Sequence, residues 1–430
     1  MRTHFIKILA VVLSCLLLAG CTFGSEAVSI IDANINDKGE LILYYSDGTK
    51  DNLGVVVGKD GLNGEDGEDG QGGPGGNINV VTDVAAATAV GLRSSVSIFC
   101  TYYEKGSWGA SEPYYTAGSG VIYQLDKKTG SAFIITNYHV VYDLDSRKSN
   151  GIAEEIDVYL YGGEIQGAEM KATYVGGSQN YDIAILRIDG SDVLKSSDAL
   201  AVTVADSNQV RVGSTAIAIG NPEGEGISAS CGVVSVDTEH IVMTGADGVT
   251  EVDFRVMRFD TPVNHGNSGG GLFDAQGRLI GIVNAKTIDD EVENIGYALP
   301  TSTVTAVADN IIDYCYNTSC ESVQRPILGV TVVTKESKGV YDPETGNMEI
   351  VERVEILEVS AGQIGSVFKT GDVLLRCTLR GQTVEITRQH HMIDLMITAR
   401  VGDVVEVTVL RDGKEVTLSL GITQGCLTAY

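Results

Sequence analysis

The segment that most limits what this chain can fold into is residues 264–274, which read Asn-His-Gly-Asn-Ser-Gly-Gly-Gly-Leu-Phe-Asp. Ser268 is preceded by Gly-Asn and followed by three glycines. Glycine lets the main chain turn sharply and approach another molecule closely at little steric cost. The amides of Gly266, Asn267 and Ser268 can then converge on one point and stabilise the oxyanion of an acyl transfer. Taken alone, the segment would also fit a plain hairpin turn.

A serine becomes reactive only when a base takes its proton and an acid orients that base. His139 lies in the apolar run 132–141, which predicts a strand that enters a turn. Asp182 is the single carboxylate that opens the alternating apolar run 183–188. Either residue alone would fit a structural role, as a buried histidine or as a residue that caps a strand. The order His139, Asp182, Ser268, with each residue in its own motif, predicts a catalytic triad.

Four further segments are distinctive: Gly-Ser-Gly-Val-Ile at 118–122, Ala-Ile-Gly-Asn-Pro at 218–222, Gly-Val-Val-Ser at 232–235 and Ile-Gly-Tyr-Ala-Leu-Pro at 295–300. The triad order resembles that of trypsin-like serine proteases and differs from the orders of subtilisins and α/β-hydrolases. Together with the four segments it closely resembles the HtrA-type, DegP-like branch. The resemblance implies a mainly β fold, with two six-stranded β-barrels and the triad in the cleft between them. Short runs rich in Val and Ile, interrupted by Gly, Asn and Asp, favour the same fold.

The resemblance also indicates what the cleft would accept. Trypsin-like enzymes that cut after Lys or Arg carry an aspartate six residues before the nucleophile, and Pro262 occupies that position here. The strand expected after the nucleophile offers Val283, Asn284 and Ala285 as an apolar wall. The sequence therefore predicts a small substrate pocket that prefers Val, Ala or similar residues before the cut. The family usually has proline at the position of His265, which is either a tolerated loop residue or, as an imidazolium at acidic pH, a perturbation of the oxyanion loop.

The start of the sequence has the pattern of an export signal. A positively charged beginning is followed by an apolar run from residue 8 to residue 18, too short for a well-flanked membrane span. Leu-Ala-Gly-Cys at 18–21 then resembles the bacterial lipobox, whose cysteine is acylated and becomes the first residue of the mature protein. A bare transmembrane anchor is the alternative. We expect residues 1–20 to be a lipoprotein signal peptide, and the exported protein to be held extracytoplasmically on a cell-envelope membrane through Cys21.

Residues 21–57 and 58–76 connect this signal to the protease-like region, residues 77–322. Residues 29–57 look like a small β unit within an otherwise tether-like segment. Glycine then stands at every third position from 58 to 76, the repeat that a collagen triple helix requires. Because this run is short and acidic, a flexible acidic stalk is the alternative. HtrA-type proteases commonly assemble as trimers, so the resemblance implies a homotrimer whose symmetry a three-stranded stalk would match.

The last part of the chain changes character. Arg-Pro-Ile-Leu-Gly-Val at 325–330 resembles the carboxylate-binding loop and first strand of a PDZ domain, which would span residues 323–430. A partner peptide would add a strand to the sheet edge, and its C-terminal carboxylate would bind main-chain amides of the loop. The loop residues expected at this site are Ile327, Leu328, Gly329 and Val330.

Other segments of this region fit the same resemblance. Residues 371–375 and 404–418 match C-terminal domains of HtrA proteins, and residues 387–400 read as the helix beside the groove. Residues 336–352 fit the pattern poorly and are interpreted as an insertion.

Composition limits the partners. The chain has 30 basic and 57 acidic residues, a net charge of −27, and no basic patch, so we expect no nucleic-acid partner. The sequence contains neither His-Glu-x-x-His nor paired Cys-x-x-Cys, so we expect no metal and no cofactor.

The cysteines are compatible with an oxidising compartment. Cys15 would leave with the signal and Cys21 would take the lipid, which leaves six. These could form three disulfides in any of fifteen connectivities, or remain free buried thiols. The one specific expectation is a disulfide between Cys315 and Cys320. The others are Cys100, Cys231, Cys377 and Cys426.

These observations predict a tethered serine endopeptidase that cleaves unfolded or damaged exported proteins. A regulatory protease for one envelope signalling protein is an alternative with the same chemistry. A peptide-binding chaperone whose catalytic site is mostly inactive is the alternative from another class. An adhesin that uses the glycine-repeat stalk is weaker, because most of the chain is protease-like.

Overall fold

The computed structural model describes residues 30–36, 38, 40–55, 84–103, 112–163, 168–284, 295–318, 320–343 and 346–430. The chain divides into two compact units, residues 1–79 and 80–430, which are described separately. Several predictions lie outside the described residues: the signal peptide at 1–20, the lipidation site Cys21, the glycine repeat at 58–76 and the pocket residue Ala285.

The first unit contains a three-stranded antiparallel sheet. The turn between its second and third strands includes Asp47, whose side chain accepts a hydrogen bond from the Thr49 amide at 2.9 Å. Gly48 follows with a φ of 83°, a conformation that favours glycine. The strands, in order across the sheet, are β1 (Ile30–Ile35), β2 (Glu40–Tyr45) and β3 (Lys50–Val55).

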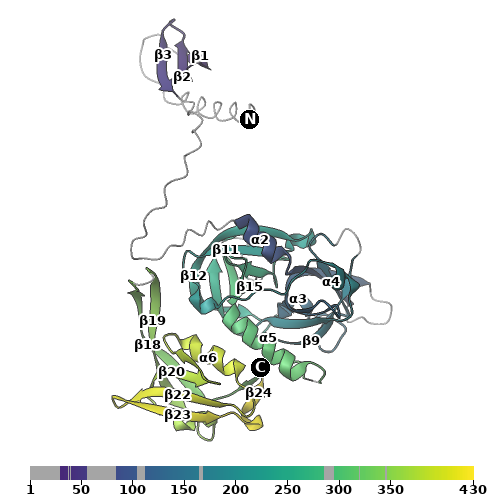
Figure 1. The fold of residues 1–430 in the computed structure, drawn as a ribbon, viewed down its shortest axis with the longest axis vertical. Coiled ribbons are helices and arrows are strands. Elements are labelled where there is room, and N and C mark those ends of the chain that lie inside the picture. Colours follow the sequence, from purple (N-terminus) through teal and green to yellow (C-terminus); the bar gives the residue numbers. More distant parts are fainter. Residues whose placement is uncertain are drawn as a thin grey trace. The chain divides into compact units, whose positions relative to one another are not determined.

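The second unit begins with helix α2 (Val84–Leu92) and a seven-stranded antiparallel sheet (Figure 1). The strand order is β8-β7-β4-β5-β6-β10-β9. The predicted first six-stranded barrel is therefore a seven-stranded sheet in the structure. Apolar side chains such as Ile98, Ile134 and Leu186 are fully buried in its core. The elements are β4 (Ser95–Tyr103), β5 (Pro113–Asp126), β6 (Ser131–Thr136), α3 (Tyr138–Val141), β7 (Glu155–Leu160), β8 (Met170–Lys171), β9 (Thr173–Ser178), β10 (Ile183–Ile188) and α4 (Asp192–Ser196).

Six further strands close into an antiparallel barrel in the order β11-β12-β13-β16-β15-β14. Phe259, Leu272 and Val283 fill its interior and have no exposed surface. The predicted mainly β fold class is confirmed. The strands are β11 (Thr215–Gly220), β12 (Ser228–Thr244), β13 (Glu251–Phe259), β14 (Gly271–Phe273), β15 (Leu279–Asn284) and β16 (Gly296–Pro300).

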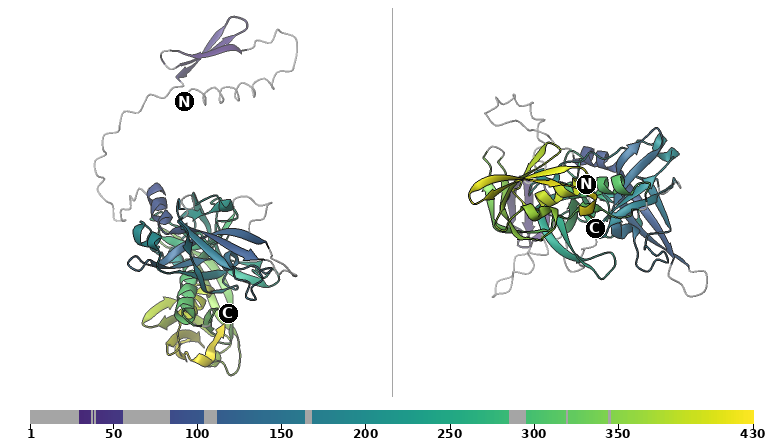
Figure 2. Two further views of the ribbon diagram at one scale, coloured as in Figure 1. Left: turned by 90° about the vertical axis from the view of Figure 1, so that its right-hand side faces the viewer. Right: turned by 90° about the horizontal axis from the view of Figure 1, so that it is seen from below.

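Helix α5 (Thr301–Cys315) lies between these two sheets and the C-terminal sheet, as Figures 1 and 2 show from three sides. Val304, Val307, Ala308 and Ile311 are buried, and their spacing places them on one face of the helix. This apolar stripe packs into the core shared by the first sheet and the barrel.

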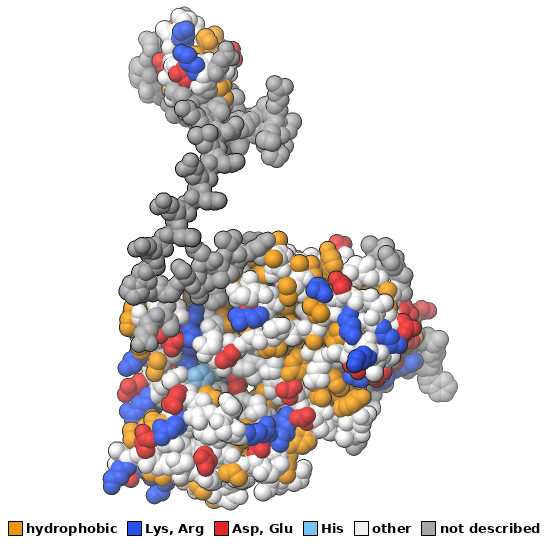
Figure 3. Space-filling view, viewed as in Figure 1, with side chains coloured by type: hydrophobic (Ala, Val, Ile, Leu, Met, Phe, Trp, Pro, Cys, Tyr) orange, Lys and Arg blue, Asp and Glu red, His pale blue; other side chains and the backbone are white. Residues whose placement is uncertain are grey.

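The C-terminal domain is a six-stranded sheet with helix α6 (Gln389–Thr398) beside it. The predicted insertion at 336–352 extends the first hairpin of this sheet, where β18 and β19 stay paired from Thr334 to Tyr341. On the face shown in Figure 3, acidic and basic side chains are interspersed over this domain. Its strands are β17 (Gln324–Pro326), β18 (Val330–Tyr341), β19 (Met348–Val359), β20 (Val373–Leu379), β21 (Gln382–Glu385), β22 (Val404–Arg411), β23 (Lys414–Gly421) and β24 (Leu427–Ala429).

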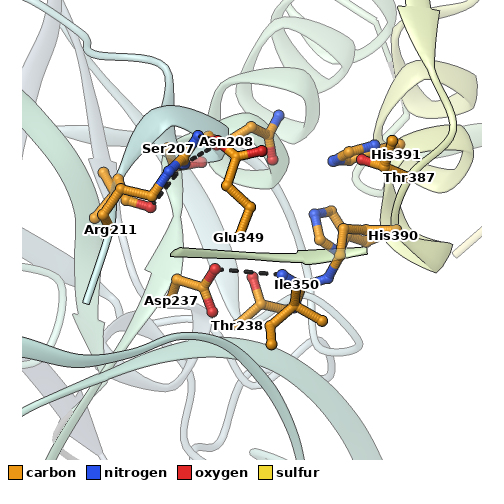
Figure 4. Close-up of a pocket in the computed structure, with 12 residues that line it drawn as sticks. Ser207, Asn208, Arg211, Asp237, Thr238, Glu349, Ile350, Thr387, His390 and His391 are labelled. Atoms are coloured by element: carbon orange, nitrogen blue, oxygen red, sulfur yellow. Dashed lines mark hydrogen bonds and ion pairs between the residues drawn. The ribbon is translucent and has the colours of Figure 1, made fainter. Parts of the chain in front are cut away.

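Buried ion pairs join the C-terminal domain to the barrel. Arg255 of β13 pairs with Asp394 of α6, and both side chains are nearly inaccessible. Asp394 also accepts a hydrogen bond from Thr303 of α5 at 2.9 Å. Figure 4 shows the small cavity next to this contact. At this cavity Arg211, which lies just before the barrel strand β11, donates a hydrogen bond to Glu349 of β19 at 2.5 Å.

Two histidines of α6 line the same cavity (Figure 4). Burial, followed by the charge of Arg255, lowers the pKa of His390 far below its ordinary value. Burial also lowers the pKa of His391, although its Nδ1 lies 2.9 Å from the Glu385 carbonyl oxygen, which opposes the shift. The charged groups around the two rings are Arg211, Arg255, Arg388, Asp237, Asp394, Glu349 and His240.

We expect folding stability to fall as the pH drops below about 6.5, the ordinary pKa of histidine. An unfolded chain binds a proton there that the buried, neutral His390 does not, so the loss of stability approaches about 1.4 kcal/mol per pH unit for His390, and His391 contributes in the same direction. Thermal unfolding of the full chain between about pH 8 and pH 5 measures this slope. His390→Gln is expected to flatten it, because the variant has no buried imidazole at this position. Equal slopes in parent and His390→Gln would contradict the assignment.

Candidate active site

His139 and Asp182 meet because their strands are neighbours. β6 ends at Thr136, which pairs with Ala184 of β10, so the residues just beyond β6 lie beside those just before β10. His139 Nδ1 is 2.7 Å from Asp182 Oδ2, and the His139 main-chain amide donates to Asp182 Oδ1 at 3.0 Å. The carboxylate therefore fixes both the ring and the main chain of His139.

Asp182 is held in an uncommon main-chain conformation. Its φ of 49° lies in the left-handed region, which costs a non-glycine residue on the order of 1–3 kcal/mol. Such a residue persists only where its surroundings fix it. Asn137 Nδ2 donates to the Asp182 carbonyl oxygen at 2.8 Å, and Asn284 Nδ2 donates to Asp182 Oδ2 at 3.0 Å. Both asparagines are fully buried.

The predicted pocket residue Asn284 therefore has a different contact. Its side chain binds Asp182 from β15, so it ties the barrel to the first sheet at the acid of the triad. A fully buried asparagine needs hydrogen-bond partners, but the burial of Asn284 and its partner Asp182 became known only from the structure. Val283 is buried and its main chain pairs with Gly269 and Gly270 at 3.0 and 2.8 Å, while Pro262 is exposed.

Ser268 is nearly buried in a loop whose glycines the geometry requires. Gly266 and Gly269 have φ values of 92° and 83°. A Cβ atom on Gly269 would collide with the Ser119 carbonyl oxygen, and one on Gly266 would collide with the Asn221 carbonyl oxygen. The two glycines thus allow the loop to press against the first sheet and the barrel at once.

Ser119 anchors this loop, a role that the sequence did not reveal. Its amide donates to the Ser268 carbonyl oxygen at 2.9 Å, and its hydroxyl donates to the Gly266 carbonyl oxygen at 2.6 Å. The same hydroxyl accepts from the Asn221 amide at 2.7 Å. In the sequence, Ser119 stood out only as part of the segment 118–122, which indicated a family resemblance and not a role in holding the loop.

One of the three predicted oxyanion amides is already engaged. The Asn267 amide donates to the Asn264 carbonyl oxygen at 3.1 Å, closing a turn within the loop. The carbonyl oxygen of His265 accepts from the Glu223 amide at 2.9 Å, and the residue itself is exposed. The exposure of His265 is compatible with both interpretations, a tolerated loop residue and an imidazolium that perturbs the loop at acidic pH.

A groove of about 370 Å³ runs between α6 and the start of β18. Met392, Ile393 and Met396 of α6 form part of its apolar lining. The turn at its end has Gly329 at a φ of 71°. The four residues expected to bind a peptide carboxylate, Ile327, Leu328, Gly329 and Val330, all line it.

The described cysteines form one disulfide and contribute to no metal site. Cys315 and Cys320 form a disulfide. The other four described cysteines are free: Cys231 is exposed, and Cys100, Cys377 and Cys426 are buried. Among the described residues, no group of three His, Cys, Asp or Glu side chains could hold a metal ion. In the same part of the chain, no helix is long and apolar enough to cross a bilayer.

Comparison with known proteins agrees with this geometry. The family described as "Trypsin-like peptidase domain" matches residues 118–282, a range that contains His139, Asp182 and Ser268. Serine protease Do-like HtrA of Lactococcus lactis subsp. cremoris (strain MG1363) is 30% identical over 376 residues, which cover 81% of this chain and 84% of that protein. The chain belongs to the HtrA-type serine protease family.

Other HtrA-type proteins match over shorter shares of their length. Serine protease Do-like HtrA of Bacillus subtilis (strain 168) is 32% identical over 72% of this chain, and the chain spans 64% of that relative. The periplasmic serine endoprotease DegP of Escherichia coli (strain K12) is 30% identical over 76% of this chain, which spans 61% of DegP. A solved structure, the HtrA-type protease AlgW with tripeptide, has a TM-score of 0.51 at 25% identity and covers 81% of this chain and 98% of its own. The predicted HtrA-type, trypsin-like fold is confirmed.

Proposed function

We propose that this HtrA-type chain is an exported serine endopeptidase that cleaves unfolded or damaged proteins of the cell envelope. The observation that carries the proposal is the His139–Asp182 pair, bonded at both carboxylate oxygens, in the same domain as the glycine-flanked Ser268. An imidazole whose Nδ1 faces a carboxylate has Nε2 available to accept the proton of a serine.

In the proposed reaction Ser268 attacks the carbonyl carbon of the scissile bond while His139 takes its proton. Asp182 stabilises the imidazolium, which then protonates the leaving amine, and water releases the acyl group by the same steps in reverse. The amides of Gly266 and Ser268 stabilise the oxyanion. The Asn267 amide joins them only if the turn to Asn264 opens.

The proposed substrate preference, peptide binding, membrane anchoring and assembly are based on the sequence. The pocket for the residue before the cut is small and apolar, prefers Val, Ala or similar residues and is bounded by the exposed Pro262, whereas the side chain of Val283 is buried in the barrel core and does not line it. The groove at Ile327–Val330 binds peptide C termini as an added strand. The protein is extracytoplasmic, lipid-anchored through Cys21 and homotrimeric. Its relative DegP is named as periplasmic, which supports an extracytoplasmic site of action.

Cleavage of unfolded casein by the full chain in detergent tests the function. We expect the parent to cut casein and Ser268→Ala not to. Peptides with free apolar C termini are added in a parallel series, because stimulation by them would favour a regulatory protease for one envelope protein. Suppressed casein aggregation without cleavage under any condition would favour the peptide-binding chaperone instead.

A further inference from the structure

The loop that carries Asp182 is contacted by residues from the far end of the chain. β9 ends at Ser178, and four residues later comes Asp182, whose amide bonds back to the Gln179 carbonyl oxygen at 3.3 Å. The Ser178 hydroxyl, almost fully buried, donates to the main-chain oxygen of Tyr430 at 2.8 Å. In Figure 1 the end marked C lies beside α5, close to the labels of β9 and β24.

Tyr181, the residue directly before Asp182, is held by the same group. Its ring centroid lies 5.1 Å from that of Tyr430, and its hydroxyl accepts a hydrogen bond from Arg325 Nη1 at 2.9 Å. The Arg325 guanidinium carbon lies 3.3 Å from the centroid of the Tyr430 ring. A guanidinium over an aromatic face and two aromatic rings at this separation are both attractive arrangements.

Arg325 and Tyr430 are themselves fixed by main-chain bonds. β17 pairs with β24, and the Tyr430 amide donates to the Val323 carbonyl oxygen at 2.9 Å. Asn310 of α5, fully buried, exchanges two hydrogen bonds of 2.8 Å with the main chain of Gln324. The Gly177 amide donates to the Glu321 carbonyl oxygen at 3.0 Å. The β17–β24 ribbon is therefore attached to both α5 and the end of β9.

From these contacts we infer that Tyr430, Arg325 and Tyr181 form a clamp of positioning residues, which holds residues 178–182 so that the Asp182 carboxylate faces His139. The inference rests on the proposed function, because it gives the clamp a role in proton transfer. Asp182 requires such support because its main chain is in the left-handed conformation, and a strained residue relaxes when its surroundings loosen. Residues outside the triad thereby set its turnover number.

The test compares Tyr430→Ala with Tyr430→Phe, which keeps the ring and the main-chain bonds. With a short peptide substrate and the full chain, we expect Tyr430→Ala to lower kcat on the order of tenfold with little change in KM, a loss typical of a small misplacement. Tyr430→Phe retains the parent kcat. Arg325→Ala should reproduce the loss, and Arg325→Lys should restore part of it because the cation over the ring returns.

Hydrogen exchange of the Asp182 amide reports how often residues 178–182 open. Measuring it in a Ser268→Ala background makes the result independent of catalytic activity. We expect faster exchange in Tyr430→Ala than in Tyr430→Phe. If the parent cleaves substrate while Tyr430→Ala and Arg325→Ala match it in kcat and in exchange, the clamp is refuted. If the parent cleaves no substrate but the Asp182 amide still exchanges faster in Tyr430→Ala than in Tyr430→Phe, the proposed function is refuted and the structural role of the clamp is retained. Should Tyr430→Ala fail to fold, Tyr181→Phe, which removes only one hydrogen bond, replaces it and is expected to lower kcat by a smaller factor.

Discussion

Ser268→Ala is expected to lower kcat on casein or a peptide substrate on the order of 10⁶-fold, because the three residues of a serine triad act as a unit. Without the hydroxyl no acyl-enzyme forms, and His139 and Asp182 have no proton to move. Some acceleration over water would remain, on the order of 10³- to 10⁴-fold, from oxyanion stabilisation and substrate binding alone. Stopped and continuous assays on the purified full chain measure both rates.

A serine elsewhere provides the matched control. Ser196→Ala removes a hydroxyl at the exposed end of α4, where it bonds only to main-chain oxygens of its own helix. This variant is expected to keep the parent kcat. Labelling by a small organofluorophosphonate should reach one group per parent chain and vanish in Ser268→Ala. A loss of less than about tenfold in Ser268→Ala would mean that another residue supplies the nucleophile.

The three candidate catalytic residues were predictable because each stands in a segment with its own chemical pattern. A histidine at the end of one buried strand and an aspartate at the start of another become neighbours once β6 and β10 pair, and their periodicity predicts both strands. Glycines flanking a serine indicate a tight loop, and the φ values of Gly266 and Gly269 explain why other residues would not fit.

The residues that hold the site were not predictable, because their roles depend on contacts between segments distant in sequence. Ser119 lies 147 residues from Gly266, to which it donates. Asn284 lies 102 residues from Asp182, and from the sequence it was interpreted as a pocket wall. Tyr430, which is 252 residues from Ser178, occupied no motif at all. Side-chain contacts of this kind are set by the register and packing of strands, which local patterns do not determine.

The strand number of the first sheet shows the same limit. The resemblance implied six strands, and the sheet has seven, of which β8 is only two residues long. A strand of two residues is too short for an alternating pattern of apolar and polar residues to be recognised in the sequence. In five strands of the six-stranded barrel, by contrast, the buried residues alternate or run continuously, so these strands could be expected; β12, with a single buried residue, is the exception.

Asp182→Asn is expected to lower kcat on the order of 10⁴-fold, the loss typical of a serine triad whose acid becomes an amide. The reason lies in the hydrogen bonds of the carboxylate. Oδ2 accepts from both His139 Nδ1 and Asn284 Nδ2, while Oδ1 accepts from the His139 amide. An asparagine can accept at one of these positions only.

If its NH₂ group faces the His139 ring, Nδ1 must accept the bond, so Nε2 carries the hydrogen and cannot take a proton from Ser268. If the amide flips, its NH₂ meets the main-chain N–H of His139, and two donors face each other in a buried site. That contact costs about 1–3 kcal/mol of folding free energy, so a lower melting temperature should accompany the kinetic loss. No rotamer of asparagine satisfies both sides.

Asp198→Asn makes the same chemical change at a highly exposed carboxylate and is expected to leave kcat and stability unchanged. Asn284→Ala removes one of the bonds to Oδ2 and leaves the other two, so its loss should be far smaller, on the order of tenfold. The ranking Asp182→Asn, Asn284→Ala, Asp198→Asn thus measures how much of the rate depends on the carboxylate and how much on its support. A kcat for Asp182→Asn within about tenfold of the parent would assign the orienting role to a different acid and overturn the proposed triad.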